Sequence, residues 1–169
     1  MSDLRNVRRL TAYNRRVFER YERALKNWGW KEATRDRGIG HLTLKDTLVH
    51  ILNVHEAWLV AVAQGRWDVF DQPGRRPQEV RSWIDLRKYR ERVWQEVDVY
   101  LERLSENDLN RTVKAPWMLG KYALKDVFFQ ISFEQAHHLG EFIGAYWQAD
   151  RRPPKMTWIE NLPGSSRSA

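Results

Sequence analysis

Apolar residues recur at helical spacing in four segments of the chain, which the sequence therefore predicts to be helices. The first covers residues 4–28 and has one apolar stripe with a strongly charged back. The second covers residues 43–65 and is apolar around much of its circumference, which favours deep burial. The third and fourth cover residues 78–104 and 124–150. Thr43 and Asp46 have the spacing of a capping pair at the start of the second helix.

The segments between these helices are polar and contain glycine or proline, which is typical of loops. Residues 111–122 are too short for a helix and favour an extended or hairpin segment around Ala115–Pro116. All three connections are longer than is usual in helical bundles, which allows one of them to cross over. The sequence thus predicts an all-α four-helix bundle with long connections and an extended C-terminal tail. We expect one domain over residues 1–163, with Met156, Trp158 and Ile159 anchoring the tail, and disorder over residues 164–169.

Composition narrows the chemistry that the chain can use. The 169 residues include no cysteine, so disulfides and thiolate zinc sites are excluded. No apolar run resembles a secretory signal or a membrane span, and together with the missing disulfides this favours a cytoplasmic protein. The net charge of +7 comes from 29 basic and 22 acidic residues that are interspersed along the chain. This pattern indicates a solvated surface of mixed charge rather than a nucleic-acid-binding protein.

A polar row interrupts the apolar pattern of the fourth helix. Gln130, Glu134 and His138 are each four residues apart, so they lie on nearly the same face. A carboxylate and an imidazole at this spacing can bind one divalent metal ion from a single helix. The alternative is that Phe133 is the buried residue, which would turn Glu134 toward the solvent. His137 lies outside the row and aligns instead with Glu141.

A third ligand would have to come from the histidines of the first half of the chain. His41 lies in a loop without an evident partner and is interpreted as a surface or entrance residue. His50 and His55 project about 140° apart on a helix, so only one can face the bundle axis, and His50 has the more apolar neighbours. A buried histidine that is satisfied by a backbone carbonyl is the alternative role for His50.

Two further patterns concern helix packing. TLKDTLVHIL at 43–52 resembles ALKDVFFQIS at 123–132. If the two helices run parallel, this resemblance places His50 level with Gln130 and Glu134. Gly140 and Gly144 form a smooth strip on the fourth helix, which would allow a close approach of another helix or subunit.

The second and fourth helices resemble the DinB/YfiT-like family of metalloenzymes. TLVHILNVHEAWL is similar to the family's second-helix pattern of a ligand histidine followed by an aromatic-containing stretch. FEQAHHLGE resembles its fourth-helix pattern His-x-x-x-His-Arg-Gly-Gln, and KMTWIEN is similar to its closing tail. The resemblance implies a metal triad of His50, Glu134 and His138. Glu134 stands where the family usually has histidine, and this carboxylate shifts the expected metal preference from nickel or copper toward zinc, iron or manganese.

The resemblance also implies a function. The family includes thiol-dependent S-transferases and hydrolases, so we expect a divalent-metal-dependent enzyme in which the metal activates a thiol or water. Its partners would be a small-molecule substrate, a low-molecular-weight thiol and a second copy of the chain in a homodimer. The alternative is a non-catalytic, stress-related helical binding protein with a vestigial metal site.

Overall fold

Four long helices form a bundle in the computed structural model, which describes residues 3–38 and 40–159. They are α1 (Asp3–Trp28), α3 (Leu44–Glu56), α4 (Trp83–Arg103) and α5 (Leu124–Gln148). The predicted four-helix bundle is therefore confirmed. Within the described ranges, no helix combines the length and the apolar character that crossing a membrane requires.

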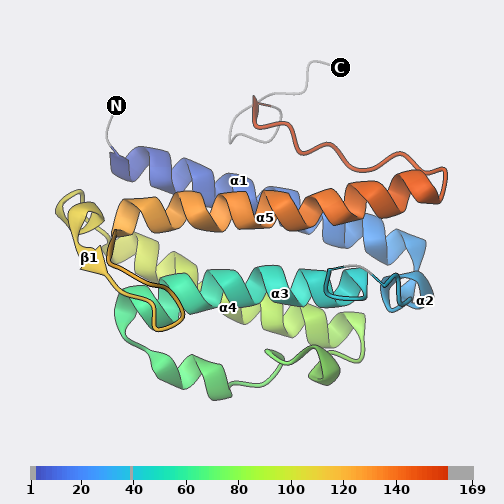
Figure 1. Cartoon of the computed structure of the whole chain (residues 1–169), viewed down its shortest axis with the longest axis horizontal. Coiled ribbons are helices and arrows are strands. Elements are labelled where there is room, and N and C mark those ends of the chain that lie inside the picture. The colour runs from blue at the N-terminus through green and yellow to red at the C-terminus, as the bar shows by residue number, and fades with distance from the viewer. Residues whose placement is uncertain (1–2, 39, 160–169) are drawn as a thin grey trace.

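The helices run in two parallel pairs (Figure 1). α1 and α5 point one way, while α3 and α4 point the other way. α3 packs against both α4 and α5, and α1 packs mainly against α5. The parallel order of α3 and α4 requires a connection that returns along the bundle, and residues 63–82 make this crossover. One of the long connections therefore crosses over, as their length in the sequence allowed.

The helix that carries His50 is covered on two sides. Residues of α3 are buried over most of its length, and the helix continues as a π-helical turn, η1 (Ala57–Val62). Its apolar circumference explains this position, because α4 and α5 each need an apolar surface to pack on. Large core side chains come from all four helices: Phe18, Tyr21, Leu48, Leu52, Leu86, Phe128 and Phe142.

Two helix starts show how local capping sets the boundaries. Thr43 Oγ1 accepts a hydrogen bond from the Asp46 N–H at 3.0 Å, so the predicted cap of α3 is confirmed. The third helix begins at Trp83 rather than at residue 78, so that prediction was wrong by one turn. Ser82 is extended and its Oγ accepts from the Asp85 N–H at 3.2 Å, which starts the helix there. Residues before it form the 3₁₀ turn η3 (Pro77–Glu79).

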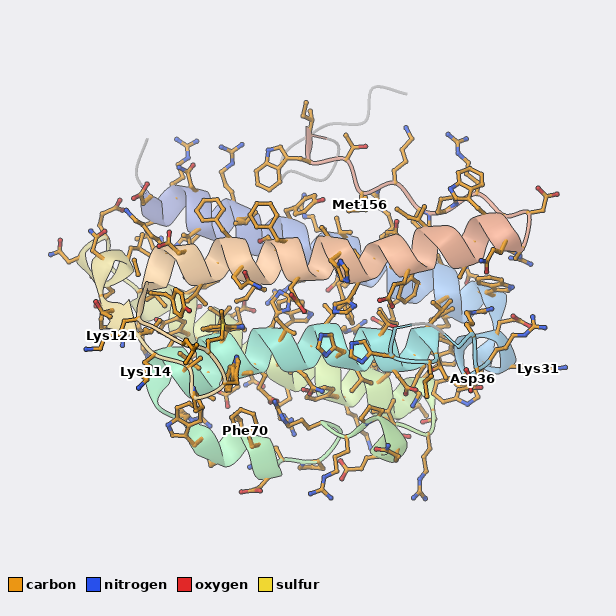
Figure 2. All side chains as sticks on the ribbon, in the orientation of Figure 1. Lys31, Asp36, Phe70, Lys114, Lys121 and Met156 are labelled. Carbon is orange, nitrogen blue, oxygen red and sulfur yellow. The ribbon has the colours of Figure 1, made fainter. Side chains whose placement is uncertain are left out.

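The remaining short elements lie at the two ends of the bundle. α2 (Trp30–Ala33) follows α1, and the 3₁₀ turns η2 (Trp67–Asp71) and η4 (Asn107–Asn110) lie in the later connections. β1 (Thr112–Val113) pairs with β2 (Tyr122–Ala123) in an antiparallel hairpin, as predicted for residues 111–122. Figure 2 shows Lys114 and Lys121 of this hairpin at the end opposite Lys31 and Asp36.

A buried carboxylate fixes the crossover to the bundle. Glu56 at the end of α3 is fully buried. Its oxygens accept hydrogen bonds from Arg75 Nη1 at 2.6 Å and Arg92 Nη2 at 3.1 Å, and the Tyr89 hydroxyl lies 3.1 Å from Glu56 Oε2 and 2.5 Å from Asn53 Oδ1. Arg75 belongs to the crossover, while Tyr89 and Arg92 belong to α4. One carboxylate therefore joins α3, the returning segment and α4, and it is fully paired, as a buried charge requires.

The tail returns over α1, and Figure 2 shows Met156 above the bundle. The Tyr13 hydroxyl donates to the Met156 carbonyl at 2.5 Å, and the Trp158 ring lies 4.9 Å from the Tyr13 ring. The predicted anchoring by Met156 and Trp158 is confirmed, whereas Ile159 is exposed. The predicted disordered residues 164–169 lie outside the described residues.

Candidate metal centre

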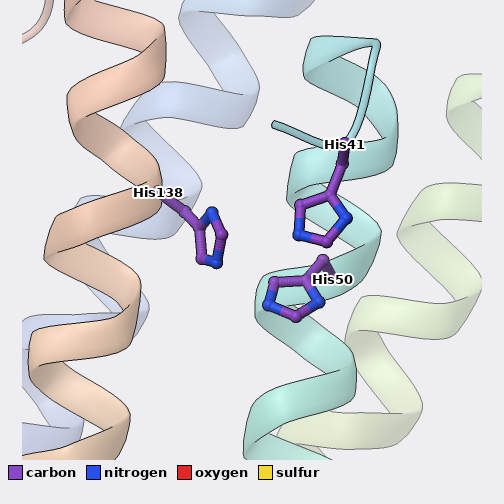
Figure 3. A group of neighbouring side chains, drawn as sticks. All are labelled: His41, His50 and His138. Carbon is purple, nitrogen blue, oxygen red and sulfur yellow. The ribbon is translucent and has the colours of Figure 1, made fainter. Parts of the chain in front are cut away.

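Three imidazoles from two helices and a loop meet between α3 and α5 (Figure 3). His50 lies on α3, His138 on α5, and His41 in the loop that precedes α3. One ring nitrogen of each histidine lies within 4.8 Å of one nitrogen of each of the other two. This spacing allows one divalent ion to contact all three.

Glu134 adds a carboxylate to the same cluster. Its Oε1 lies 3.3 Å from His138 Nε2 and 3.6 Å from His50 Nε2. Phe133 is 70% exposed, so the alternative in which Phe133 is buried and Glu134 faces the solvent does not apply. Gln130 Nε2 also donates to Glu134 Oε2, at 3.4 Å. The polar row of the fourth helix is therefore contiguous in the structure.

α3 and α5 run antiparallel, so the condition of parallel helices, under which the similarity of 43–52 and 123–132 would place His50 level with Glu134, is not met. The pairing of Thr47 with Glu141 and of His50 with Glu134 shows this order directly. Residues shared at a helix start reflect similar capping needs and carry no information on direction. His50 reaches the level of Glu134 all the same, because both residues lie well inside their helices.

Glu141 orients His138 from the opposite side of its ring. His138 Nδ1 lies 3.2 Å from Glu141 Oε1, and in the tautomer with its proton on Nδ1 the ring donates to this carboxylate. The Thr47 hydroxyl donates to the other oxygen, Glu141 Oε2, at 3.2 Å. Glu141 thus pairs with His138, although its spacing aligns it with His137. His138 points into the bundle, and Glu141 contacts this buried ring rather than the exposed ring of His137.

This tautomer leaves electron pairs facing one another. With its proton on Nδ1, neutral His138 presents the Nε2 lone pair to Glu134 Oε1, which is also an acceptor. His50 Nε2 lies next to both, is buried, and has no hydrogen-bond partner within the described residues. With both Nε2 atoms unprotonated, a cation among these acceptors, either a proton or a metal ion, would balance them. The donor set therefore fits a divalent ion.

The histidines are held in the form that binds metal. Burial, followed by the neighbouring imidazoles of His41 and His138, lowers the pKa of His50 to about 4. Burial and the charge of His138 also lower the pKa of His41. Both rings are thus neutral at neutral pH, which is the state in which imidazole donates to a metal.

The interpretation of His41 as a partnerless surface residue was wrong. Its ring stacks on that of His50 with centroids 3.9 Å apart and lies 4.9 Å from that of His138. The loop reaches this position through left-handed backbone at Gly40 (φ 51°) and Leu42 (φ 70°). The Thr43 N–H donates to the His41 carbonyl across Leu42, which forms a strained γ-turn. Strain of this kind persists only where the surroundings enforce it.

Gly40 is the glycine that the site requires. A side chain at this position would overlap the carboxylate of Glu141. With a Cβ at position 40, the Glu141 carboxylate that orients His138 would have to move. Helical periodicity carries no information on such a contact, and the sequence shows only that this loop contains glycine.

His55 and His137 stay out of the cluster. His55 is fully buried on the other side of α3, where its ring lies 4.8 Å from that of Trp94 and its Nδ1–H donates to the Ile51 carbonyl at 2.9 Å. His50 was predicted to be the interior histidine of the two, but His55 is the more buried one, because α3 is covered by α4 as well as by α5. His137 is exposed, as predicted, although His137, His138 and Glu141 form a second group with ligand atoms within 4.8 Å.

Comparison with known proteins agrees with this arrangement. No curated protein matches the sequence. The model of the DinB superfamily matches residues 13–142, which include the three clustered histidines, Glu134 and Glu141. This match covers more than half of the chain, and the four packed helices agree with it. The chain belongs to the DinB superfamily.

Proposed function

We propose that this protein is a divalent-metal-dependent enzyme whose ion is held by His50, Glu134 and His138. The observation that carries the proposal is the buried, unpartnered Nε2 of His50, which faces the acceptors of Glu134 and His138. The buried Nε2 of His55 also lacks a hydrogen-bond partner, but the His55 ring lies against Trp94, whereas His50 Nε2 lies among the potential metal ligands Glu134 and His138. Two imidazoles and one carboxylate suit zinc, iron, manganese or nickel.

The residues around the ligands keep them in this arrangement. Glu141 holds the Nδ1 proton of His138 and thereby directs its Nε2 lone pair toward Glu134. Thr47 holds Glu141 in turn from α3. Such partners of a ligand histidine commonly change metal affinity by 10–100-fold when they are lost. The Leu42 turn presents His41 as an additional donor from the loop.

His41 bears directly on whether the centre is catalytic. Four protein donors would close a tetrahedral site, as in structural zinc sites, whereas a catalytic site keeps a position open. His41 is the donor that can leave, because it belongs to a loop while the others belong to long helices. We propose that three helix-borne residues retain the ion and that His41 yields its place to the substrate.

The chemistry that we propose is thiol-dependent S-transfer or hydrolysis. A divalent ion at this position supplies a Lewis acid that makes a thiol or a water molecule a better nucleophile at neutral pH. Nucleophile and electrophile would be small molecules, since the cluster is reached between a loop and two helices. The proposal rests on membership of the DinB superfamily together with the cluster of donors.

The test is elemental analysis of protein purified without a metal-affinity tag. We expect about one ion per chain in the wild type and its loss in Glu134→Ala and His50→Ala. His137→Ala is the matched control, because this exposed imidazole adjoins the site without facing the cluster. The metal-loaded wild type should then consume a low-molecular-weight thiol in the presence of an electrophile, and Glu134→Ala should not.

Two results would contradict the proposal. Wild-type protein that stays metal-free after incubation with zinc, iron, manganese and nickel would favour the alternative, a helical binding protein with a vestigial site. Metal that is retained in His50→Ala but lost in His137→Ala would show that the ion is bound by the second group of residues.

A further inference from the structure

Aromatic side chains gather at the end of the bundle that carries the β1–β2 hairpin. The Trp117 ring in the hairpin loop has its centroid 5.6 Å from that of Trp58 on η1. It also lies 6.5 Å from the ring of Trp67 and 6.2 Å from that of Phe70, and these two rings of η2 stack on each other. The hairpin loop and the crossover, which are far apart in the sequence, thus form one aromatic cluster.

Part of this cluster faces the solvent. Trp67 is 44% exposed and Trp117 is 48% exposed, and Leu119 beside them in the hairpin loop is 96% exposed. The Tyr122 hydroxyl donates to the Leu119 carbonyl, and the chain turns at Gly120 with a φ of 100°. These contacts fix the loop through its backbone and leave the leucine side chain outside. Large apolar side chains are stabilised when they leave water, so this surface favours a partner that covers it.

The hairpin that carries this surface is basic. Residues 109–125 contain four basic residues and no acidic residue. Arg111 is turned inward and Lys125 is paired with an acidic residue of α1. Lys114 and Lys121 are exposed, and neither makes a hydrogen bond or an ion pair within the part of the chain that the structure describes. Two free ammonium groups therefore flank the apolar tip.

We propose that this end of the bundle docks onto a lipid surface with anionic headgroups. Trp117 and Leu119 enter the boundary between headgroups and acyl chains, where an indole ring keeps its apolar body in the lipid and its N–H among polar groups. Lys114 and Lys121 contact the headgroup phosphates. Such docking requires no helix that crosses the bilayer.

The shape and the charge of the tip favour a lipid surface over a protein partner. Leu119 projects from the hairpin and lines no hollow, and a projecting apolar side chain can enter between headgroups. A protein groove that is apolar enough to take this tip would leave Lys114 and Lys121 next to it without counter-charges. In an anionic bilayer, phosphate groups lie at the level of the indole ring, so one surface satisfies both the rings and the lysines.

The acidic residues of η2 limit the strength of the docking. Asp68 is paired with Arg66 at 3.5 Å, but Asp71 is exposed near the aromatic cluster and opposes the attraction. One such carboxylate against two free lysines leaves a small positive balance. We therefore expect reversible docking that weakens as salt screens the charges.

The first experiment is co-sedimentation of the full chain with lipid vesicles. Vesicles of phosphatidylcholine with phosphatidylglycerol should bind the wild type at least about tenfold more tightly than vesicles of phosphatidylcholine alone. Leu119→Asp should abolish the binding, and Lys121→Glu should weaken it by about tenfold. Ile84→Asp and Lys31→Glu are the matched controls and should bind as the wild type does. Ile84 is exposed on α4, and Lys31 lies at the opposite end of the bundle (Figure 2).

A fluorescent label tests whether the tip enters the lipid. The chain contains no cysteine, so Leu119→Cys offers a single attachment point for a nitrobenzoxadiazole label. Its emission should rise and shift to shorter wavelength when the anionic vesicles are added, because the label leaves water. The same label on Ile84→Cys should not respond.

Three results would overturn the proposal. The first is a wild-type chain that does not co-sediment with the anionic vesicles. The second is binding that persists in both Leu119→Asp and Lys121→Glu, and the third is binding that leaves the label at position 119 unchanged. In the last two cases the net charge of +7 would attract the chain without this surface. No result depends on whether the metal centre is catalytic.

Discussion

His41 and His50 stack with their ring centroids 3.9 Å apart and their planes 26° apart. One ring comes from a loop and the other from a helix, so the contact ties the segment before α3 to the helix itself. Burial lowers the pKa of both imidazoles, and neutral rings can stack without charge repulsion. The stack therefore belongs to a site that is built to hold unprotonated donors.

Metal should protect the loop that carries His41. We expect trypsin to cleave after Arg35 and Arg37 more slowly in the metal-loaded protein than in the metal-free protein, because the ion would hold the loop through His41. His41→Ala should abolish this protection while retaining the ion at weaker affinity. Cleavage after the exposed Arg81 at the end of the crossover is the internal control and should not respond to metal. Equal protection in wild type and His41→Ala would show that the loop donor does not bind.

Gly40 and Gly38 form a matched pair for testing the position of Glu141. Both have left-handed backbone, with φ of 51° and 66°, so alanine strains the loop by about 1 kcal/mol at either position. Only at Gly40 would the new side chain overlap Glu141. We expect Gly40→Ala to lower metal affinity by roughly tenfold, and Gly38→Ala to leave it within about threefold, as measured by competition with a chelator. Equal effects would mean that Glu141 does not orient His138.

His55 should make the fold sensitive to acid. Complete burial lowers its pKa from 6.5 to about 4. The unfolded chain then binds this proton at higher pH than the folded chain, so stability is intact above pH 6.5 and falls as the pH decreases toward 4. The contribution of His55 to this loss is about 3 kcal/mol, at 1.36 kcal/mol for each unit of pKa.

The measurement is urea unfolding of the metal-free protein at a series of pH values. His55→Leu should flatten the dependence between pH 6.5 and 4, although His50 keeps part of it because its pKa is also lowered. His137→Leu is the control, since this ring is exposed, and should follow the wild type. An unchanged slope in His55→Leu would contradict the expected depression of the His55 pKa.

Glu56→Ala should destabilise the fold without touching the metal centre. It would leave two guanidinium groups without their carboxylate, and breaking a buried ion pair costs about 3–5 kcal/mol. The loss should lie near the lower end, because the side chains of Arg75 and Arg92 are 13% and 27% exposed. Asp98→Ala breaks the exposed pair with Arg15 and should cost below about 1 kcal/mol in the same denaturation experiment.

The fold could be predicted because helix periodicity and capping are local properties. Thr43 marks the start of α3, and the apolar circumference of α3 indicated that this helix is deeply buried. Helix direction is not local, so the order of the bundle was not predictable, and the similarity of 43–52 and 123–132 gave no information on it. The start of α4 was predicted too early because the apolar pattern already begins at Val80, whereas the Ser82 cap starts the helix at Trp83.

The same distinction between local and non-local properties decides which site residues could be predicted. Glu134 and His138 share a helix, so their spacing predicts their meeting. His50 follows from its apolar surroundings on α3. His41 could not be found in this way, because its position depends on the positive φ angles of Gly40 and Leu42 and on the passage of the loop beside Glu141. His55 was misjudged because an apolar helix can hide a histidine on either side.

The packing of α1 against α5 has a consequence for the order in which this chain acquires its structure. α1 leaves the ribosome before α5, which is its main partner, and its outer face is covered later still by the tail that follows α5. Tyr21 therefore lacks its contact with Phe142 until α5 has been made. A chain that ends before α5 keeps this apolar stripe of α1 exposed, so a truncated product is marked for chaperones and proteases by α1.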